Sequence, residues 1–122
     1  KLANNLNADI FVSIHVNAHK EDGHLGTETY VAPDSDENTL LLAHFVQKDL
    51  VKELDTFNRG VKKNELYVIT HTNMPAILSE VAFISNPKEE KLLKKVKFKK
   101  QAATALYEGI SKYFELLAEE EF

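Results

Sequence analysis

The sequence has no cysteine, few glycines and prolines, and no long apolar run. The absence of cysteine among its 122 residues excludes disulfide scaffolds, thiolate zinc sites and cysteine nucleophiles. No apolar stretch approaches the roughly 18 residues that a membrane-spanning helix needs. The net charge of −4 argues against nucleic acid as the main partner, because proteins that bind nucleic acid usually carry a basic surface. The lysines of residues 88–100 have helical spacing, so they predict a solvated helix face rather than a polyanion-binding patch.

The apolar residues that are present alternate between strand-like and helix-like patterns. Runs rich in β-branched and aromatic residues predict strands at 10–17, 27–32, 66–69 and 76–82. Apolar stripes at helical spacing predict helices over 37–54, 87–96 and 98–119, and polar composition predicts connections at 18–26 and 55–65. Strands interleaved with helices predict an α/β fold in one domain. We expect a mostly parallel twisted sheet with helices on both faces, because the core strands are apolar throughout.

The first residues have the pattern of a helix that is already under way. Residues 1–8 look like its last turns, and they lead directly into the first predicted core strand. A natural chain rarely begins in this way. We therefore expect the 122 residues to be the C-terminal part of a longer polypeptide, whose targeting signal would lie outside them.

Two polar residues interrupt apolar strand patterns. His15 lies near the carboxyl end of the first predicted strand, where open α/β sheets place their ligand chemistry. A lone histidine there is more often a core residue with one backbone hydrogen bond. Glu80 lies within the apolar run 77–84, where an ionised carboxylate is costly unless it is paired, hydrogen-bonded or near a metal. A salt bridge with an edge lysine explains Glu80 alone as well as catalysis does, but together the imidazole and the carboxylate are parts of a zinc hydrolase.

The other histidines are weaker candidates. His19 is four residues from His15, but that spacing in an extended chain is roughly 13 Å, so we reject a helical metal-binding pair. His24, in the same loop, is expected on the rim of the site or facing substrate. His44 is expected on a helix surface or in helix packing, and His71, after a predicted strand, is a weak candidate for lining the cleft.

Two longer segments form specific motifs. The first is Ser13-Ile14-His15-Val16-Asn17-Ala18, followed by Gly26-Thr27-Glu28-Thr29-Tyr30. The second runs from Met74 to Pro87 (MPAILSEVAFISNP). In this order they resemble the two signatures of the zinc-dependent N-acetylmuramoyl-L-alanine amidases, a family of bacterial cell-wall hydrolases.

The resemblance implies a role for each matching residue. His15 would be a zinc ligand, Glu80 the catalytic glutamate, and Asn17 a residue that supports the site or contacts substrate. The implied reaction is hydrolysis of the amide bond between N-acetylmuramic acid and L-alanine by a zinc-activated water. Glu80 would take the proton of that water and later deliver one to the leaving amine. The resemblance also implies peptidoglycan as the partner, a monomer, and a location at the cell wall or in the periplasm.

The chain departs from the family pattern at two places. Ala82 stands where members often have glycine, and two further zinc ligands, a histidine and a glutamate, are expected before Lys1. We therefore interpret residues 1–122 as the C-terminal part of a single amidase-like catalytic domain without its N-terminal strand and helix. As it stands the chain should hold zinc poorly and be inactive. The alternatives are a catalytically silent amidase-like domain that binds cell wall or regulates another hydrolase and, more distantly, a different α/β hydrolase.

Overall fold

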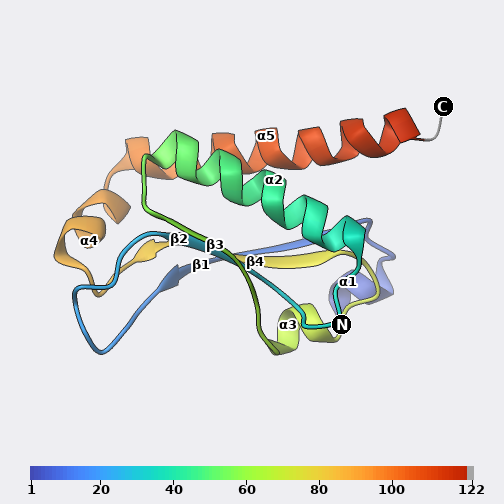
Figure 1. The fold of residues 1–122 in the computed structure, drawn as a ribbon, viewed down its shortest axis with the longest axis horizontal. Helices are drawn as coiled ribbons and strands as arrows, with labels where there is room; N and C mark the ends of the chain where they lie inside the picture. The colour runs from blue at the N-terminus through green and yellow to red at the C-terminus, as the bar shows by residue number, and fades with distance from the viewer. Residues whose placement is uncertain (121–122) are drawn as a thin grey trace.

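The computed structural model describes residues 1–120, which form one four-stranded sheet with helices packed on it (Figure 1). In chain order the elements are α1 (Leu2–Asn5), β1 (Phe11–Asn17), β2 (Thr27–Val31), α2 (Glu37–Leu54), β3 (Asn58–Lys63), α3 (Tyr67–Thr70), β4 (Ala76–Phe83), α4 (Pro87–Leu93) and α5 (Val96–Glu120). The strands lie in the order β1-β4-β2-β3. β1 pairs with β4 and β2 with β3 in parallel, while β2 and β4 are antiparallel. The predicted α/β fold with a mostly parallel sheet is confirmed.

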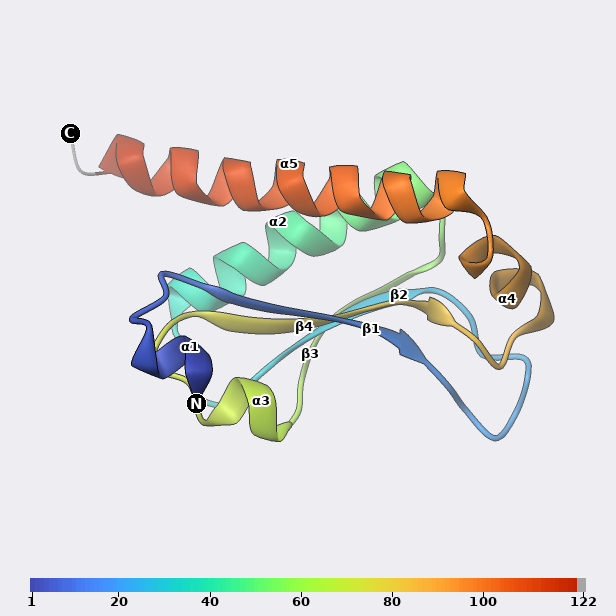
Figure 2. The same ribbon diagram turned by 180° about the vertical axis from the view of Figure 1, so that it is seen from behind.

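The two long helices lie on the same face of the sheet. Figures 1 and 2 show α2 and α5 stacked over this face and the short α3 on the opposite side. The main core lies under the long helices, where Val31 and Ile77 of the sheet join Leu42 of α2 and Leu106 of α5. Most of the helical cover is therefore on one face, and the other face is left largely to the side chains of the sheet itself.

The opposite face is covered at one end. There Leu66 and Ile69 pack against Phe11, Ala76 and Leu78, near the amino ends of β1 and β4. The carboxyl ends of the same two strands lead toward the loop 18–26 and toward α4, as Figure 2 shows. No helix within residues 1–120 is both long and apolar enough to cross a membrane.

The edge strand β3 was not expected from the sequence. Polar composition predicts a connection over 55–65, but Asn58–Lys63 pair with β2 in parallel. Gln47 of α2 supplies part of the reason, because its buried side-chain amide donates to the carbonyl of Thr27 at 2.7 Å and to Oδ1 of Asn58 at 2.9 Å. A strand with little β propensity thus forms because a neighbouring strand and a buried amide hold it.

The predicted strand at 66–69 is also wrong, because Tyr67–Thr70 form a single helical turn. Its four apolar or aromatic residues fit either structure by pattern alone. In the fold, Leu66 and Ile69 both contact the small cluster on the open face. Residues three apart share a side in a helix but point to opposite sides in a strand, so the helical turn lets both be buried.

The first strand is less buried than its composition predicts. β1 is an edge of the sheet, and the side chains of Ile14 and Val16 are 56% and 48% exposed. Both line an apolar groove of about 530 Å³ together with Val81, Phe98 and Leu106. The exposed apolar surface that an open sheet edge predicts is therefore present at β1.

Candidate active site

His15 and Glu80 lie side by side. They are register partners on the parallel neighbours β1 and β4, close to the carboxyl end of each strand. Thr29 and Ser79 bond to each other and Thr29 reaches Gln47 of α2, so these two residues face the long helices. Side chains alternate along a strand, and His15 and Glu80 therefore project from the opposite, more open face. The fold thus brings together the two polar residues that interrupt the apolar strand patterns.

The imidazole of His15 is exposed, and it contacts the side chain of one residue of the same strand. The hydroxyl of Ser13, two residues earlier on the same face, lies 2.7 Å from Nε2 of His15. This contact orients the ring. The histidine is not the buried core residue that its sequence context first suggests, because β1 is an edge strand.

Glu80 has an unsatisfied carboxylate oxygen. Its Oε2 is the buried side-chain polar atom without a hydrogen-bond partner among residues 1–120. Burial raises the pKa of Glu80, the neighbouring charge of His15 lowers it, and the negative charge of Glu28 raises it further. A half-buried carboxyl group with a raised pKa and a free oxygen is suited to accept and release a proton. Within residues 1–120 no salt bridge joins Glu80 to a lysine, which was the alternative explanation of this residue.

Glu28 lies on the other side of Glu80, as its register partner on the antiparallel strand β2. The residue is 2% exposed. Four side chains donate hydrogen bonds to its carboxylate: Tyr30 and Asn17 (3.2 Å) to Oε1, and Arg59 (2.7 Å) and Lys62 (2.9 Å) to Oε2. Burial alone would raise the pKa of Glu28, but the hydrogen bonds from Tyr30, Lys62 and Arg59 outweigh burial and lower this pKa to about 2. Glu28 is therefore a fixed anion at the end of the row His15–Glu80–Glu28.

Asn17 connects the end of β1 to this anion. Its side-chain nitrogen donates to Oε1 of Glu28, and its Oδ1 accepts a hydrogen bond from the amide of Ala18 at 2.9 Å. Its carbonyl accepts a third bond from the amide of Ile84 at 2.8 Å. These contacts suit the predicted role of Asn17 in supporting the site.

The loop 18–26 forms one wall beside the row. The rings of His19 and His24 stack with centroids 3.7 Å apart, and Nε2 of His24 is 3.7 Å from Oε2 of Glu21. His24 lines a cavity of about 480 Å³ together with Phe57 and Arg59. Neither His15 nor Glu80 lines this cavity, so the place of His24 on the rim of the site stays a prediction.

The end of this loop is held by a buried carboxylate. Glu89 accepts hydrogen bonds from the amides of Gly26, at 3.1 and 3.0 Å, and of Phe83, at 2.8 Å. Gly26 has a φ of 109°, and a Cβ atom at that position would lie 2.5 Å from the carbonyl oxygen of Phe57. The loop can therefore enter β2 only through a glycine.

The remaining histidines lie away from the site. His44 is exposed on α2, as predicted. His71 follows α3, before the amino end of β4, and its ring packs against Tyr67 at a centroid distance of 4.5 Å. The interpretation of His71 as a cleft residue is therefore wrong, because the segment before it is a helical turn at the other end of the sheet.

The geometry agrees with the relationship that sequence comparison finds. The family model described as N-acetylmuramoyl-L-alanine amidase matches residues 1–112. The chain belongs to this family.

Individual amidases and one uncharacterised relative are similar over most of the chain. YqiI of Bacillus subtilis (strain 168), an uncharacterised protein, is 42% identical over 88% of this chain and 52% of its own length. The N-acetylmuramoyl-L-alanine amidase LytC of the same organism is 39% identical over 88% of this chain and 22% of its own length. The crystal structure of N-acetylmuramoyl-L-alanine amidase from Clostridium difficile 630 superposes with a TM-score of 0.91 at 36% identity, covering 93% of this chain and 62% of that one. The chain thus spans about half or less of these curated relatives.

Two residues beside the candidate site, Glu28 and Arg59, were not predicted from the sequence. Glu28 belongs to the first of the two motifs, but the sequence pattern did not indicate a role for it. Arg59 lies in residues 55–65, which were predicted to be a connection. A charged residue between the buried Thr27 and Thr29 was a usable signal for Glu28. No local signal marks Arg59, since its contact with Glu28 joins residues 31 apart in the chain.

The metal implied by the amidase family can be compared with the residues present. Among residues 1–120 no group of three or more histidine, cysteine, aspartate or glutamate side chains is arranged to hold a metal ion. A catalytic zinc usually has three protein ligands. The described residues therefore do not by themselves form a three-ligand zinc site.

Proposed function

We propose that the protein is a peptidoglycan hydrolase that cleaves the amide bond between N-acetylmuramic acid and L-alanine. The observation that carries the proposal is the pairing of His15 with Glu80 at the carboxyl ends of adjacent strands, in a chain of the amidase family. This pairing lies on the face of the sheet away from α2 and α5, as the contacts of Thr29 and Ser79 on the other face indicate.

Glu80 is the general base and acid of the proposed reaction. It takes a proton from the attacking water and returns one to the amine of L-alanine as the amide bond breaks. The raised pKa of Glu80 supports this role, because a carboxyl group exchanges protons most effectively when its pKa lies close to the working pH. Its unsatisfied Oε2 supports the role as well, since no protein donor competes for that oxygen within residues 1–120.

His15 is the proposed zinc ligand of this chain. Two further ligands would come from polypeptide that these 122 residues do not include, which makes the chain the C-terminal part of a catalytic domain. When bound, zinc would supply Lewis-acid activation of the water and of the amide carbonyl. Ser13 orients the imidazole, and Asn17 links the end of β1 to the fixed anion Glu28. We also propose a monomer that acts outside the cytoplasm, at the cell wall, where the substrate lies.

The test uses a longer natural polypeptide that contains this chain. Purified peptidoglycan is the substrate, and released stem peptides and bound zinc are measured together. Glu80→Ala should keep the zinc and lower hydrolysis by roughly two to four orders of magnitude. His15→Ala should lose both zinc and activity, while His44→Ala, at an exposed position on α2, should change neither.

Two outcomes would contradict the proposal. Full activity of Glu80→Ala would remove the glutamate from the mechanism. A longer polypeptide that binds peptidoglycan without releasing stem peptides would favour the silent wall-binding domain, which the incomplete metal site of residues 1–120 also suits. Zinc titration into the 122-residue chain should show no tight stoichiometric binding, and micromolar binding lost on mutation of His19 or His24 would place the metal elsewhere.

A further inference from the structure

The charges around Glu28 do not balance. Nε of Arg59 and Nζ of Lys62 both contact Oε2 of Glu28, at 2.7 and 2.9 Å, so two cations meet one anion. Glu80 forms a salt bridge with neither cation in the described part of the chain, although it is the strand neighbour of Glu28. The cluster Glu28–Arg59–Lys62 therefore carries one surplus positive charge beside the candidate active site.

Both cations keep donors that the protein does not use. A guanidinium group has five N–H donors, and within residues 1–120 that of Arg59 uses two, to Glu28 and, at 3.1 Å, to the carbonyl of Leu25. The guanidinium carbon also lies 5.0 Å from the centre of the Phe83 ring, which is a cation–π contact. The side chains of Arg59 and Lys62 are 22% and 40% exposed, so the surplus charge reaches solvent.

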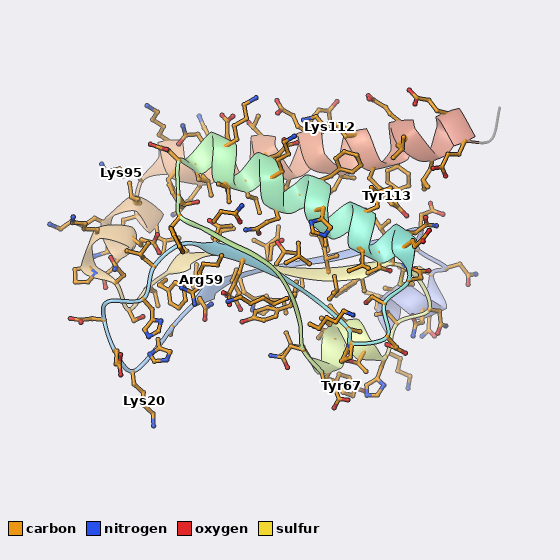
Figure 3. All side chains as sticks on the ribbon, viewed as in Figure 1. Lys20, Arg59, Tyr67, Lys95, Lys112 and Tyr113 are labelled. Carbon is orange, nitrogen blue, oxygen red and sulfur yellow. The ribbon has the colours of Figure 1, made fainter. Side chains whose placement is uncertain are left out.

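Of the two cations, Arg59 lines a cavity, whereas Lys62 contacts Glu28 from outside the lining of that cavity. Arg59 lines the cavity of about 480 Å³ with His24, Leu25 and Phe57, at the sheet end near the loop that carries Lys20 (Figure 3). Neighbouring strands are about 4.8 Å apart, so Glu28 is roughly 10 Å from His15 across the sheet. An extended peptide covers that distance with about three residues.

We propose that Arg59 and Lys62 bind a carboxylate on the peptide side of the substrate, within about three residues of the cleaved amide. This inference rests on the proposed function and names a specificity determinant within it. The positive charge of Arg59 and Lys62 favours the peptide side of the substrate over the glycan side. The glycan offers neutral hydroxyl and acetamido groups, whereas the peptide offers carboxylates. The site therefore prefers a stem peptide with a free carboxylate over the same peptide with a carboxamide, since a charge-assisted hydrogen bond is about twice as strong as a neutral one.

The test compares two probes that differ in one group. N-acetylmuramoyl-L-alanyl-D-glutamic acid γ-methylamide, whose only carboxylate is the α-carboxylate, and its α-carboxamide are titrated separately into the zinc-free 122-residue chain, and binding is followed by NMR chemical-shift changes. The acid should bind about tenfold more tightly than the amide. Arg59→Gln and Lys62→Gln should each reduce this ratio toward one, and Arg59→Lys should restore part of it.

Lys63 provides the matched control. It is the next residue of β3 and is exposed, and no salt bridge joins it to Glu28 among the described residues. Lys63→Gln should keep the full preference for the acid. The dispersion of the NMR spectrum shows whether each variant is folded, and Lys62→Gln remains informative if Arg59→Gln unfolds.

Equal affinities of the wild-type chain for acid and amide would overturn the inference, and so would a preference that survives both Arg59→Gln and Lys62→Gln. Hydrolysis is tested separately, on peptidoglycan with the longer polypeptide. Release of stem peptides without an acid preference leaves the proposed function and removes the carboxylate site. An acid preference without hydrolysis removes the proposed function and leaves a carboxylate-binding site in a silent domain.

Discussion

Glu28 and Glu80 are register partners on antiparallel strands, and the protein neutralises only one of them. Glu28 pairs with Arg59 and Lys62, while Oε2 of Glu80 is buried without a hydrogen-bond partner among residues 1–120. Hydrogen bonding overcomes burial at Glu28 and lowers its pKa to about 2, whereas burial is the main cause of the raised pKa of Glu80. Neighbouring carboxyl groups whose pKa values are driven apart have different uses: a fixed anion and a proton carrier.

The two glutamates should therefore affect stability in opposite directions. Glu80→Gln is expected to increase the free energy of unfolding at pH 7, because ionised Glu80 is disfavoured in the folded chain. Glu28→Gln is expected to decrease it by about 2 to 3 kcal/mol, because two partly buried cations lose their carboxylate. Urea unfolding of the 122-residue chain measures both changes.

Glu90→Gln is the control for these two substitutions, since the salt bridge of Glu90 within residues 1–120 is a solvent-exposed pair with Lys94, at 3.6 Å. It should change the free energy of unfolding by less than about 0.5 kcal/mol. If Glu80→Gln destabilised the chain as strongly as Glu28→Gln, the carboxylate of Glu80 would be a structural group rather than a poised one.

Acid should remove the stability that Glu28 contributes. Its folded-state pKa of about 2 lies below the ordinary value of 4.5, so the contribution is fully present above pH 4.5 and is lost as the pH falls toward 2. The shift corresponds to about 3 kcal/mol, and screening reduces it little because the side chain is 3% exposed. Unfolding curves between pH 6 and 2 should therefore fall more steeply for the wild type than for Glu28→Gln. Parallel curves would show that Glu28 is not held as an anion.

Gln47 should control the attachment of β3. Its Nε2 donates to Thr27 and Asn58, and its Oε1 accepts from Thr29 at 2.9 Å, so Gln47→Leu removes one hydrogen bond from each of three polar groups that link α2, β2 and β3. We expect a loss of about 2 to 3 kcal/mol in the free energy of unfolding. Hydrogen exchange of the β3 amides should accelerate more than that of β4, which lies inside the sheet. Lys48→Leu, at the exposed neighbouring position, should leave both unchanged, and uniform acceleration in Gln47→Leu would mean that β3 does not open separately.

The sequence by itself determined the elements that have a strong hydrophobic pattern. α2 spans Glu37–Leu54 as its apolar stripe predicts, and Asp36 caps it by accepting a hydrogen bond from the amide of Thr39. β4 and α5 also lie within two residues of their predicted bounds. The same pattern marked His15 and Glu80, because a polar residue inside an apolar strand is unusual enough to be visible locally.

Only the tertiary structure decided which strands are neighbours and which charges meet. β3 and α3 were predicted wrongly because their short segments have no decisive period, and contacts with β2, Gln47 and the cluster on the open face fix their structure. The order β1-β4-β2-β3 brings Glu28 next to Glu80 and within reach of Arg59, residues 52 and 31 positions away in the chain (80 − 28 and 59 − 28). Hydrophobic periodicity is a local property that can be recognised in the sequence. The pairing of distant charges depends on strand register, which exists only once the sheet has formed.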